Sequence, residues 1–120
     1  MLTVKKTTTH PVTVALDACG GGVMLSLQDV DGVTFRQTMN ASDVGAVLRA
    51  CIRVRDGDIY QTTVCEGDLV VIRSGTGLTF KWPCKGDFGL VHMSVENIFV
   101  FYEALKSYCR LLMRSPEEMP

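Results

Sequence analysis

Cys19 is the residue best placed for nucleophilic chemistry, because it stands directly before three glycines that can leave a thiolate exposed. A catalytic cysteine normally needs a histidine base within hydrogen-bond reach. His10 and His92 are the only histidines in the sequence, and neither belongs to a recognisable motif. Cys51 and Cys109 stand at helical spacing within apolar stripes, which is typical of core cysteines. We therefore interpret Cys19 as a turn residue rather than a nucleophile.

Two short loops match ligand-binding motifs in part. Asp29-Val30-Asp31-Gly32 resembles the start of a calcium loop but lacks the third acid and the closing glutamate. Ser74-Gly75-Thr76-Gly77 lacks the Gly-Lys-Ser/Thr sequence and the following helix of a phosphate-binding loop. Both segments favour hairpin turns, and the histidines and cysteines show no standard metal-ligand spacing. The sequence thus predicts a protein that is not an enzyme and holds no metal or cofactor.

Basic and aromatic residues on the predicted strands point to a different chemistry. Arg36 stands between two threonines at an outward-facing strand position. The second half of the chain adds four candidates of the same two kinds: Arg73, Lys81, Trp82 and Lys85. Single-stranded nucleic acid is held by basic groups along its backbone and by aromatic rings that stack on its bases. We expect the four cations to contact phosphates and Trp82 to stack on a base, although the same residue types also suit an ordinary solvated sheet face.

The overall charge argues against a protein that binds duplex DNA. The chain has 120 residues and a formal net charge of −1, whereas neutralising duplex phosphates normally requires a basic excess. No apolar run reaches the ~18 residues of a membrane span, and the first residues lack the apolar region of a signal peptide. The five cysteines include no CxxC pair. We therefore expect reduced thiols, a cytoplasmic or otherwise intracellular location and no membrane partner.

The elements that must position these residues follow one pattern used twice. A chain of this length favours a single domain, here residues 1–120, built of two pseudo-repeats at about 12–55 and 59–114. Alternating apolar and polar residues predict strands at 12–16, 23–28, 33–39, 78–82 and 89–93. Strands are also predicted at 59–64, where the second unit opens, and at 69–72, which is a continuous apolar run. Residues 2–5 are predicted as a short strand or an extended arm. A unit of about 55 residues is only marginally stable alone, so the two units should share a core or pair across a dimer.

Each group of strands is followed by a predicted helix. Asn40 is a suitable N-cap for the first helix, with Asp43 three residues on to meet its positive end. An apolar stripe at helical spacing then runs from Val44 to Ile52. Ser94 is the expected cap of a longer C-terminal helix, whose start is apolar nearly all round. The sequence therefore predicts an α+β protein with antiparallel sheets, two strands-then-helix units and a long C-terminal helix.

This order of strands, helix, strands and helix resembles the fold shared by Whirly proteins, Pur-alpha repeats and the single-stranded-DNA-binding transcriptional coactivators. The segment 93–105 is similar in style to the helix opening of a Pur repeat. The resemblance is topological and covers most of the chain. It implies that single-stranded DNA or RNA binds on the sheet surface, with Arg36, Lys81 and Trp82 as the main contacts.

Two hypotheses for the function follow. In the first, the chain is a non-enzymatic protein that binds single-stranded nucleic acid on a β-sheet face and forms a homodimer or another homo-oligomer. In the second, it is a protein-interaction or assembly module, such as an accessory subunit, an inhibitor or a small viral structural protein. Its interface would then be carried by Phe99, Phe101 and Tyr102 on the C-terminal helix. The near-neutral charge and the apolar start of that helix favour the second hypothesis.

Overall fold

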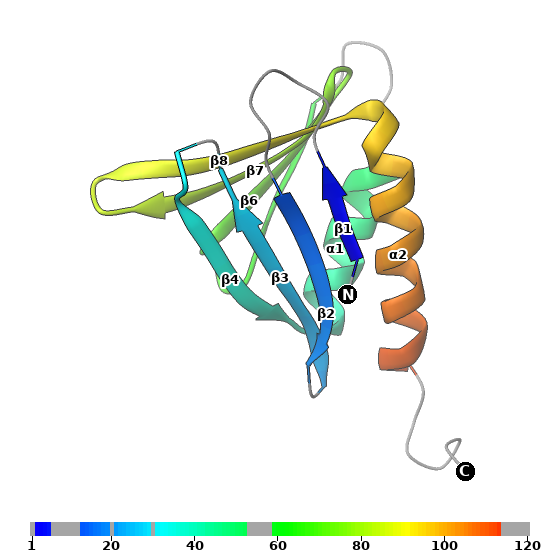
Figure 1. Ribbon diagram of the computed structural model, residues 1–120. Coiled ribbons are helices and arrows are strands. Elements are labelled where there is room, and N and C mark those ends of the chain that lie inside the picture. The colour runs from blue at the N-terminus through cyan, green and yellow to red at the C-terminus, as the bar shows by residue number, and fades with distance from the viewer. Residues whose placement is uncertain (1, 6–12, 20, 30, 53–58, 114–120) are drawn as a thin grey trace.

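The described part of the chain folds into two antiparallel sheets and two helices (Figure 1), here in a computed structural model. The backbone is described for residues 2–5, 13–19, 21–29, 31–52 and 59–113. Side chains are described for residues 14–17, 21–29, 31–52 and 59–108. Four strands and a helix are followed by four more strands and a second helix. This confirms the predicted α+β class with two strands-then-helix units.

Sheet A is formed by the first four strands, paired in the order of the sequence. They are β1 (Leu2–Lys5), β2 (Thr13–Cys19), β3 (Gly22–Gln28) and β4 (Thr34–Met39). Sheet B repeats the same antiparallel order with the next four strands. These are β5 (Tyr60–Val64), β6 (Leu69–Ser74), β7 (Gly77–Cys84) and β8 (Asp87–Ser94). Helix α1 spans Ala41–Ile52 and helix α2 spans Val95–Met113.

The turn between β3 and β4 is a hairpin, as its sequence predicts. Asp29 is buried, and its Oδ1 accepts hydrogen bonds at 2.9 Å from the backbone amides of Asp31 and Val33. Gly32 has a φ of +84°, a conformation that glycine adopts at little cost. The carboxylate of Asp29 therefore organises its own turn.

Helix α1 begins after Asn40, the N-cap that the sequence predicts, and the structure shows that this cap is reciprocal. The backbone amide of Asp43 donates to Oδ1 of Asn40 at 2.8 Å, and the amide of Asn40 donates to Oδ2 of Asp43 at 3.3 Å. These bonds satisfy amides that the first helical turn leaves without partners, and they place an acidic group at the positive end of the helix. The cap fixes where β4 ends and α1 begins.

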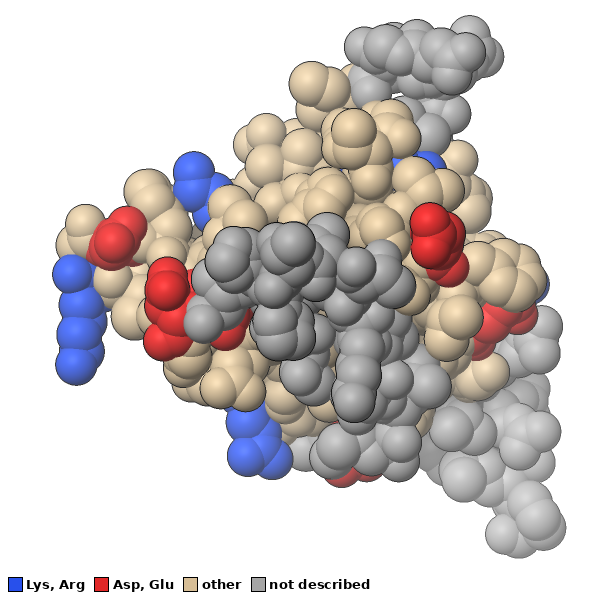
Figure 2. Space-filling model, turned by 45° about the horizontal axis from the view of Figure 1, so that its top comes forward, with Lys and Arg blue, Asp and Glu red and all other residues tan. Residues whose placement is uncertain are grey.

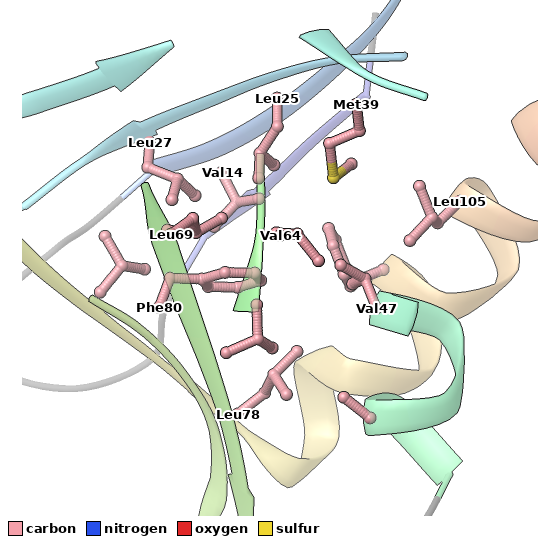
Figure 3. Close-up of a cluster of buried hydrophobic side chains, with 14 of the residues drawn as sticks. Val14, Leu25, Leu27, Met39, Val47, Val64, Leu69, Leu78, Phe80 and Leu105 are labelled. Carbon is pink, nitrogen blue, oxygen red and sulfur yellow. The ribbon is translucent and has the colours of Figure 1, made fainter. Parts of the chain in front are cut away.

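The two units pack on each other within the chain, because each helix also reaches the other unit. Helix α1 follows sheet A but contacts β5 and β6 of sheet B, while α2 follows sheet B and also contacts β1 and β2. The helices contact each other on one side of the molecule (Figure 1). Figure 3 shows side chains from both sheets and both helices meeting in one cluster: Val14, Leu25, Leu27, Met39, Val47, Val64, Leu69, Leu78, Phe80 and Leu105.

The hairpin of β7 and β8 is longer than the sequence pattern predicts. Pro83 and Cys84, expected in a loop, continue β7, and Phe88 already lies in β8. The turn is reduced to Lys85 and Gly86, whose φ angles of +46° and +81° are those of a tight two-residue hairpin. Pro83 is tolerated because it pairs with Phe88 of β8 beyond the last pair of β6 with β7. The longer hairpin adds Phe88 to the sheet surface.

Candidate nucleic-acid interface

The outer face of sheet B carries the residues that best match a ligand-binding surface. Lys81 on β7 lies between Val70 on β6 and Leu90 on β8. Side chains alternate between the faces of a strand, and the neighbouring Phe80 and Val91 point into the core. Lys81 and Leu90 therefore point outward.

Lys81 and Phe88 form a cation–π pair on this face. The Nζ atom of Lys81 lies 4.1 Å from the centre of the Phe88 ring, well within the range in which an ammonium is attracted to an aromatic face. Phe88 is 56% exposed and Leu90 is 48% exposed. An open aromatic ring and an ammonium are thus held together on a strand surface, which is the combination that stacks on a base and contacts a phosphate.

The next row of the same face is polar and partly covered. Thr79 and His92 are opposite each other on β7 and β8, and Oγ1 of Thr79 lies 2.8 Å from Nδ1 of His92. Both residues are half-buried. This hydrogen bond fixes one ring nitrogen of His92 against the sheet.

Lys85 lies at the tip of the hairpin and is exposed. The hairpin extends past sheet A at the left of the molecule in Figure 1. In the view of Figure 2, Lys and Arg side chains stand apart from one another, with Asp and Glu side chains between them. Lys and Arg side chains therefore do not gather into one basic patch on that face. Of the predicted cations, Lys81 and Lys85 share the β7–β8 hairpin.

Trp82 is placed in the core, which corrects the prediction that it stacks on a base. It alternates with Lys81 and therefore belongs to the inner face of β7. Its residue is 3% exposed, and its ring centre lies 5.8 Å from that of Phe35 in sheet A. The indole joins the two sheets and is out of reach of a ligand on the surface.

Arg73 is also buried, which corrects its predicted role as a phosphate contact. It is 7% exposed, and its guanidinium donates hydrogen bonds to the carbonyl oxygens of Cys51, Ser74 and Gly77. Cys51 lies in the last turn of α1, where carbonyls without helical partners and the negative helix end favour a cation. Arg73 thus ties the end of α1 to the β6–β7 hairpin.

Arg36 is exposed, as predicted, but on the other sheet. It points outward from β4 opposite Ser26 on β3. An open depression of about 380 Å³ lies beside it, with Ala15, Gln28 and Thr34 among its lining residues. Because both sheets turn their inner faces to one core, Arg36 does not share a face with Lys81.

The three predicted interface residues on helix α2 differ in how far their side chains are exposed. Phe101 is fully buried, with its ring centre 5.7 Å from that of Phe80 in an edge-to-face arrangement. This corrects its assignment to an interface. Phe99 is 70% exposed, and Tyr102 is half-buried under Nζ of Lys106, which lies 5.7 Å from the ring centre. The exposed apolar surface is therefore the start of the helix, with Val95 and Phe99.

Burial raises the pKa of two of the described cysteine thiols. Burial raises the pKa of the Cys51 thiol to about 12, against a smaller lowering effect of Arg73. Burial, and then the carboxylates of Asp43 and Asp68, raise the pKa of the Cys65 thiol to about 11. Among the residues with a described position, no three His, Cys, Asp or Glu side chains group as metal ligands. His10 and the side chains of Cys19 and Cys109 lie outside the described residues.

The sheet faces and the helices are the basis for assigning a function, because two sequence comparisons give no family and no relative. No protein-family model matches the chain, and no curated protein matches its sequence significantly. Neither described helix is both long and apolar enough to cross a membrane.

Proposed function

We propose that the protein binds single-stranded DNA or RNA on the outer face of sheet B and catalyses no reaction. The observation that carries this proposal is the pairing of an exposed aromatic ring, Phe88, with the ammonium of Lys81 at 4.1 Å. A base stacks on the open side of the ring, and the ammonium contacts the adjoining phosphate. Leu90 extends the apolar surface on the same strand.

The sparse charge of this face suits a single strand better than a duplex. Two lysines, Lys81 and Lys85, lie on the hairpin, and the chain as a whole has a net charge of −1. Duplex binding relies on neutralising many phosphates, whereas a single strand exposes bases whose stacking contributes about 1–3 kcal/mol each. Stacking on Phe88 therefore supplies the affinity that a small number of cations does not.

The topological resemblance to Whirly proteins, Pur-alpha repeats and the transcriptional coactivators supports the same proposal. Those families use strands followed by a helix, in two copies, and the resemblance implies nucleic acid on the sheet surface. In this chain the contacts that we propose are Lys81, Lys85 and Phe88, with Arg36 as a separate contact on sheet A. Trp82 and Arg73 act instead as internal supports.

The proposal is tested by fluorescence anisotropy of a labelled, unstructured oligonucleotide. The wild-type protein should bind it in low salt, and the affinity should fall modestly with salt because few phosphates are neutralised. Lys81→Glu should weaken binding, since it places a negative charge at the phosphate contact, whereas Lys106→Glu on helix α2 should leave binding unchanged. An unstructured strand that does not bind in low salt would refute the function.

The exposed start of α2 favours a second candidate, an assembly module. Phe99 is 70% exposed and has exposed Val95 and Val100 beside it on the helix. Apolar side chains gathered in this way are typical of a protein contact. Light scattering with Phe99→Ser separates the candidates, because an assembly that depends on α2 and ignores oligonucleotides would favour the second one.

A further inference from the structure

Phe88 and Leu90 are exposed apolar side chains on strand β8, on the face that we propose binds nucleic acid. They alternate with Gly89 and Val91, which are buried, so both point outward from sheet B. Outward residues two positions apart on an antiparallel strand are separated by about 6.8 Å along its length. Two bases packed against these side chains would be held at the same separation.

This spacing is about twice that of neighbouring bases in a stacked strand, which follow one another at about 3.4 Å. Two successive nucleotides can therefore occupy the positions at Phe88 and Leu90 only when their bases are pulled apart. A strand bound in this way is extended along β8. It has lost the stacking between those two bases.

The ammonium of Lys81 limits the Phe88 ring to one base. Its Nζ atom lies over the ring, 4.1 Å from the centre, which leaves the other face of the ring for a base. A base on that face cannot continue through the ring into a longer stack, because the ammonium occupies the far side. The ring thus ends a stack of bases and does not insert into one.

The apolar surface is also short and lies between two cations. Lys81 pairs with Leu90 in the β7–β8 ladder, and Lys85 lies in the turn beyond Phe88. On the other side of Leu90, the next row of this face is the hydrogen-bonded pair of Thr79 and His92. The site therefore offers two base positions with a lysine at each end, which fits a short stretch of extended strand.

We propose that this face selects single strands whose bases stack weakly on one another, which are pyrimidine-rich strands, over adenine-rich ones. Pulling two bases apart costs the stacking between them, and adenines stack on each other more strongly than thymines or uracils do. Preferences of this kind arise from stacking strength and backbone flexibility, without hydrogen bonds to base edges. Phe88 and Leu90 have no side-chain hydrogen-bonding group for such bonds. The inference rests on the proposed function and names the class of strand that the same site takes.

Competition against a labelled deoxythymidine strand tests the preference. The unlabelled competitors are deoxythymidine, deoxyuridine and deoxyadenosine strands of equal length, so that all three offer the same number of phosphates to the lysines. The deoxythymidine and deoxyuridine strands should compete equally well. Both should compete about 5- to 10-fold better than the deoxyadenosine strand, which is the effect of about one lost stacking step.

Circular dichroism of the deoxyadenosine strand measures the unstacking itself, because its near-ultraviolet signal comes from stacked adenines. Saturation with the protein should reduce this signal. An unchanged signal in the fully bound strand would overturn the inference.

Leu90→Ala removes one of the two base positions at an exposed residue, so the fold should be retained. The variant should bind the deoxythymidine strand about 3- to 10-fold more weakly, because a base loses its apolar contact. It should also lose much of the preference over deoxyadenosine, because a single held base need not be separated from its neighbour. Thr63→Ala is the matched control and should change neither quantity. Thr63 is exposed in the same row of sheet B, which runs through Val70 and Lys81 to Leu90.

The outcomes separate this inference from the proposed function. Equal competition by all three strands would overturn the inference and leave the function standing, and so would a Leu90→Ala protein that keeps the full preference. A deoxyuridine strand that competes as weakly as deoxyadenosine would also overturn it, because recognition of the thymine methyl group would then explain the preference. A protein that binds none of the strands in low salt would refute the function and the inference together.

Discussion

Gly89 lies directly opposite Trp82 in the β7–β8 ladder, and the indole ring fills the space that a side chain at Gly89 would need. A Cβ atom at residue 89 would stand 2.0 Å from Cε2 of the ring. The same ring packs on Phe35 of sheet A. The absence of a side chain at Gly89 thus leaves room for the Trp82 ring, which contacts Phe35 of the other sheet.

Gly89→Ala should destabilise the protein, because the added Cβ would overlap the buried indole ring that packs between the two sheets. We expect a loss of about 1–3 kcal/mol in the free energy of unfolding, the usual cost of overpacking a core. Urea denaturation followed by circular dichroism measures it. Gly75→Ala is the matched control, since a Cβ at Gly75 meets nothing within 4 Å. Equal midpoints for the two variants would contradict this account of the ring.

Trp82→Ala should lower stability by about 3–5 kcal/mol, the usual cost of removing a large aromatic side chain from a core. Trp82→Phe should cost less, because the Nε1 donor of Trp82 has no hydrogen-bond partner among the described residues, so no bond to them is lost. Thermal unfolding compares the two variants. A folded Trp82→Phe protein should bind an oligonucleotide as the wild type does. A selective loss of binding would indicate that Trp82 does contact the nucleic acid.

Arg73→Met should lower the free energy of unfolding by about 2–4 kcal/mol, because three carbonyl oxygens, two of them in buried hydrogen bonds, lose a charged donor. Arg36→Met is the matched control on an exposed strand position and should change stability by about 0.5 kcal/mol or less. Chemical denaturation of both variants tests the difference. An Arg73→Met protein as stable as the wild type would show that the hydrogen bonds to Cys51, Ser74 and Gly77 contribute little.

Stability should fall as the pH rises above about 9, in part because of Cys51. Its thiol ionises near 9.0 when exposed, while burial raises its pKa in the folded protein to about 12. Between these values the unfolded chain loses a proton that the folded chain keeps, so rising pH favours unfolding. Cys51→Val removes this contribution. The fall in denaturation midpoint from pH 8 to pH 10.5 should be shallower for Cys51→Val, and parallel curves would argue against it.

Much of the fold can be read from local patterns. Asn40 and Asp43 mark the start of α1 because the cap is made by residues three positions apart, and the Asp29 turn is likewise closed by its own side chain. Alternating apolar and polar residues mark the strands, because one face of each sheet is buried and the other is exposed. These features depend on near neighbours in the sequence and were therefore predictable.

The candidate site was harder to predict because it depends on which face of a strand each residue occupies. Trp82 and Lys81 are neighbours in sequence, but alternation places them on opposite faces of β7. The same rule would have grouped Trp82 with Leu78 and Phe80 in the core. Phe88 was not predicted as a site residue, because Pro83 suggested a loop in this region. Phe88 and Leu90 stand two positions apart, and this spacing was the available signal that both face outward from one strand.

Arg73 shows what sequence patterns leave out. Alternation with Leu69 and Val71 places it on the buried face, where an arginine is expected only with partners. One of its partners, the carbonyl of Cys51, is 22 positions earlier and on a helix. Only the packing of α1 against β6 brings that carbonyl within reach.

The most direct test of the proposed function compares two exposed phenylalanines in one binding assay. Phe88→Ala removes the ring beside Lys81, and Phe99→Ala removes a more exposed ring from helix α2. Loss of one stacked base costs about 1–3 kcal/mol, so Phe88→Ala should weaken binding of a labelled single-stranded oligonucleotide by about 5- to 150-fold. Phe99→Ala should bind as the wild type does. Unchanged affinity in Phe88→Ala, or an equal loss in both variants, would contradict nucleic-acid binding on the outer face of sheet B.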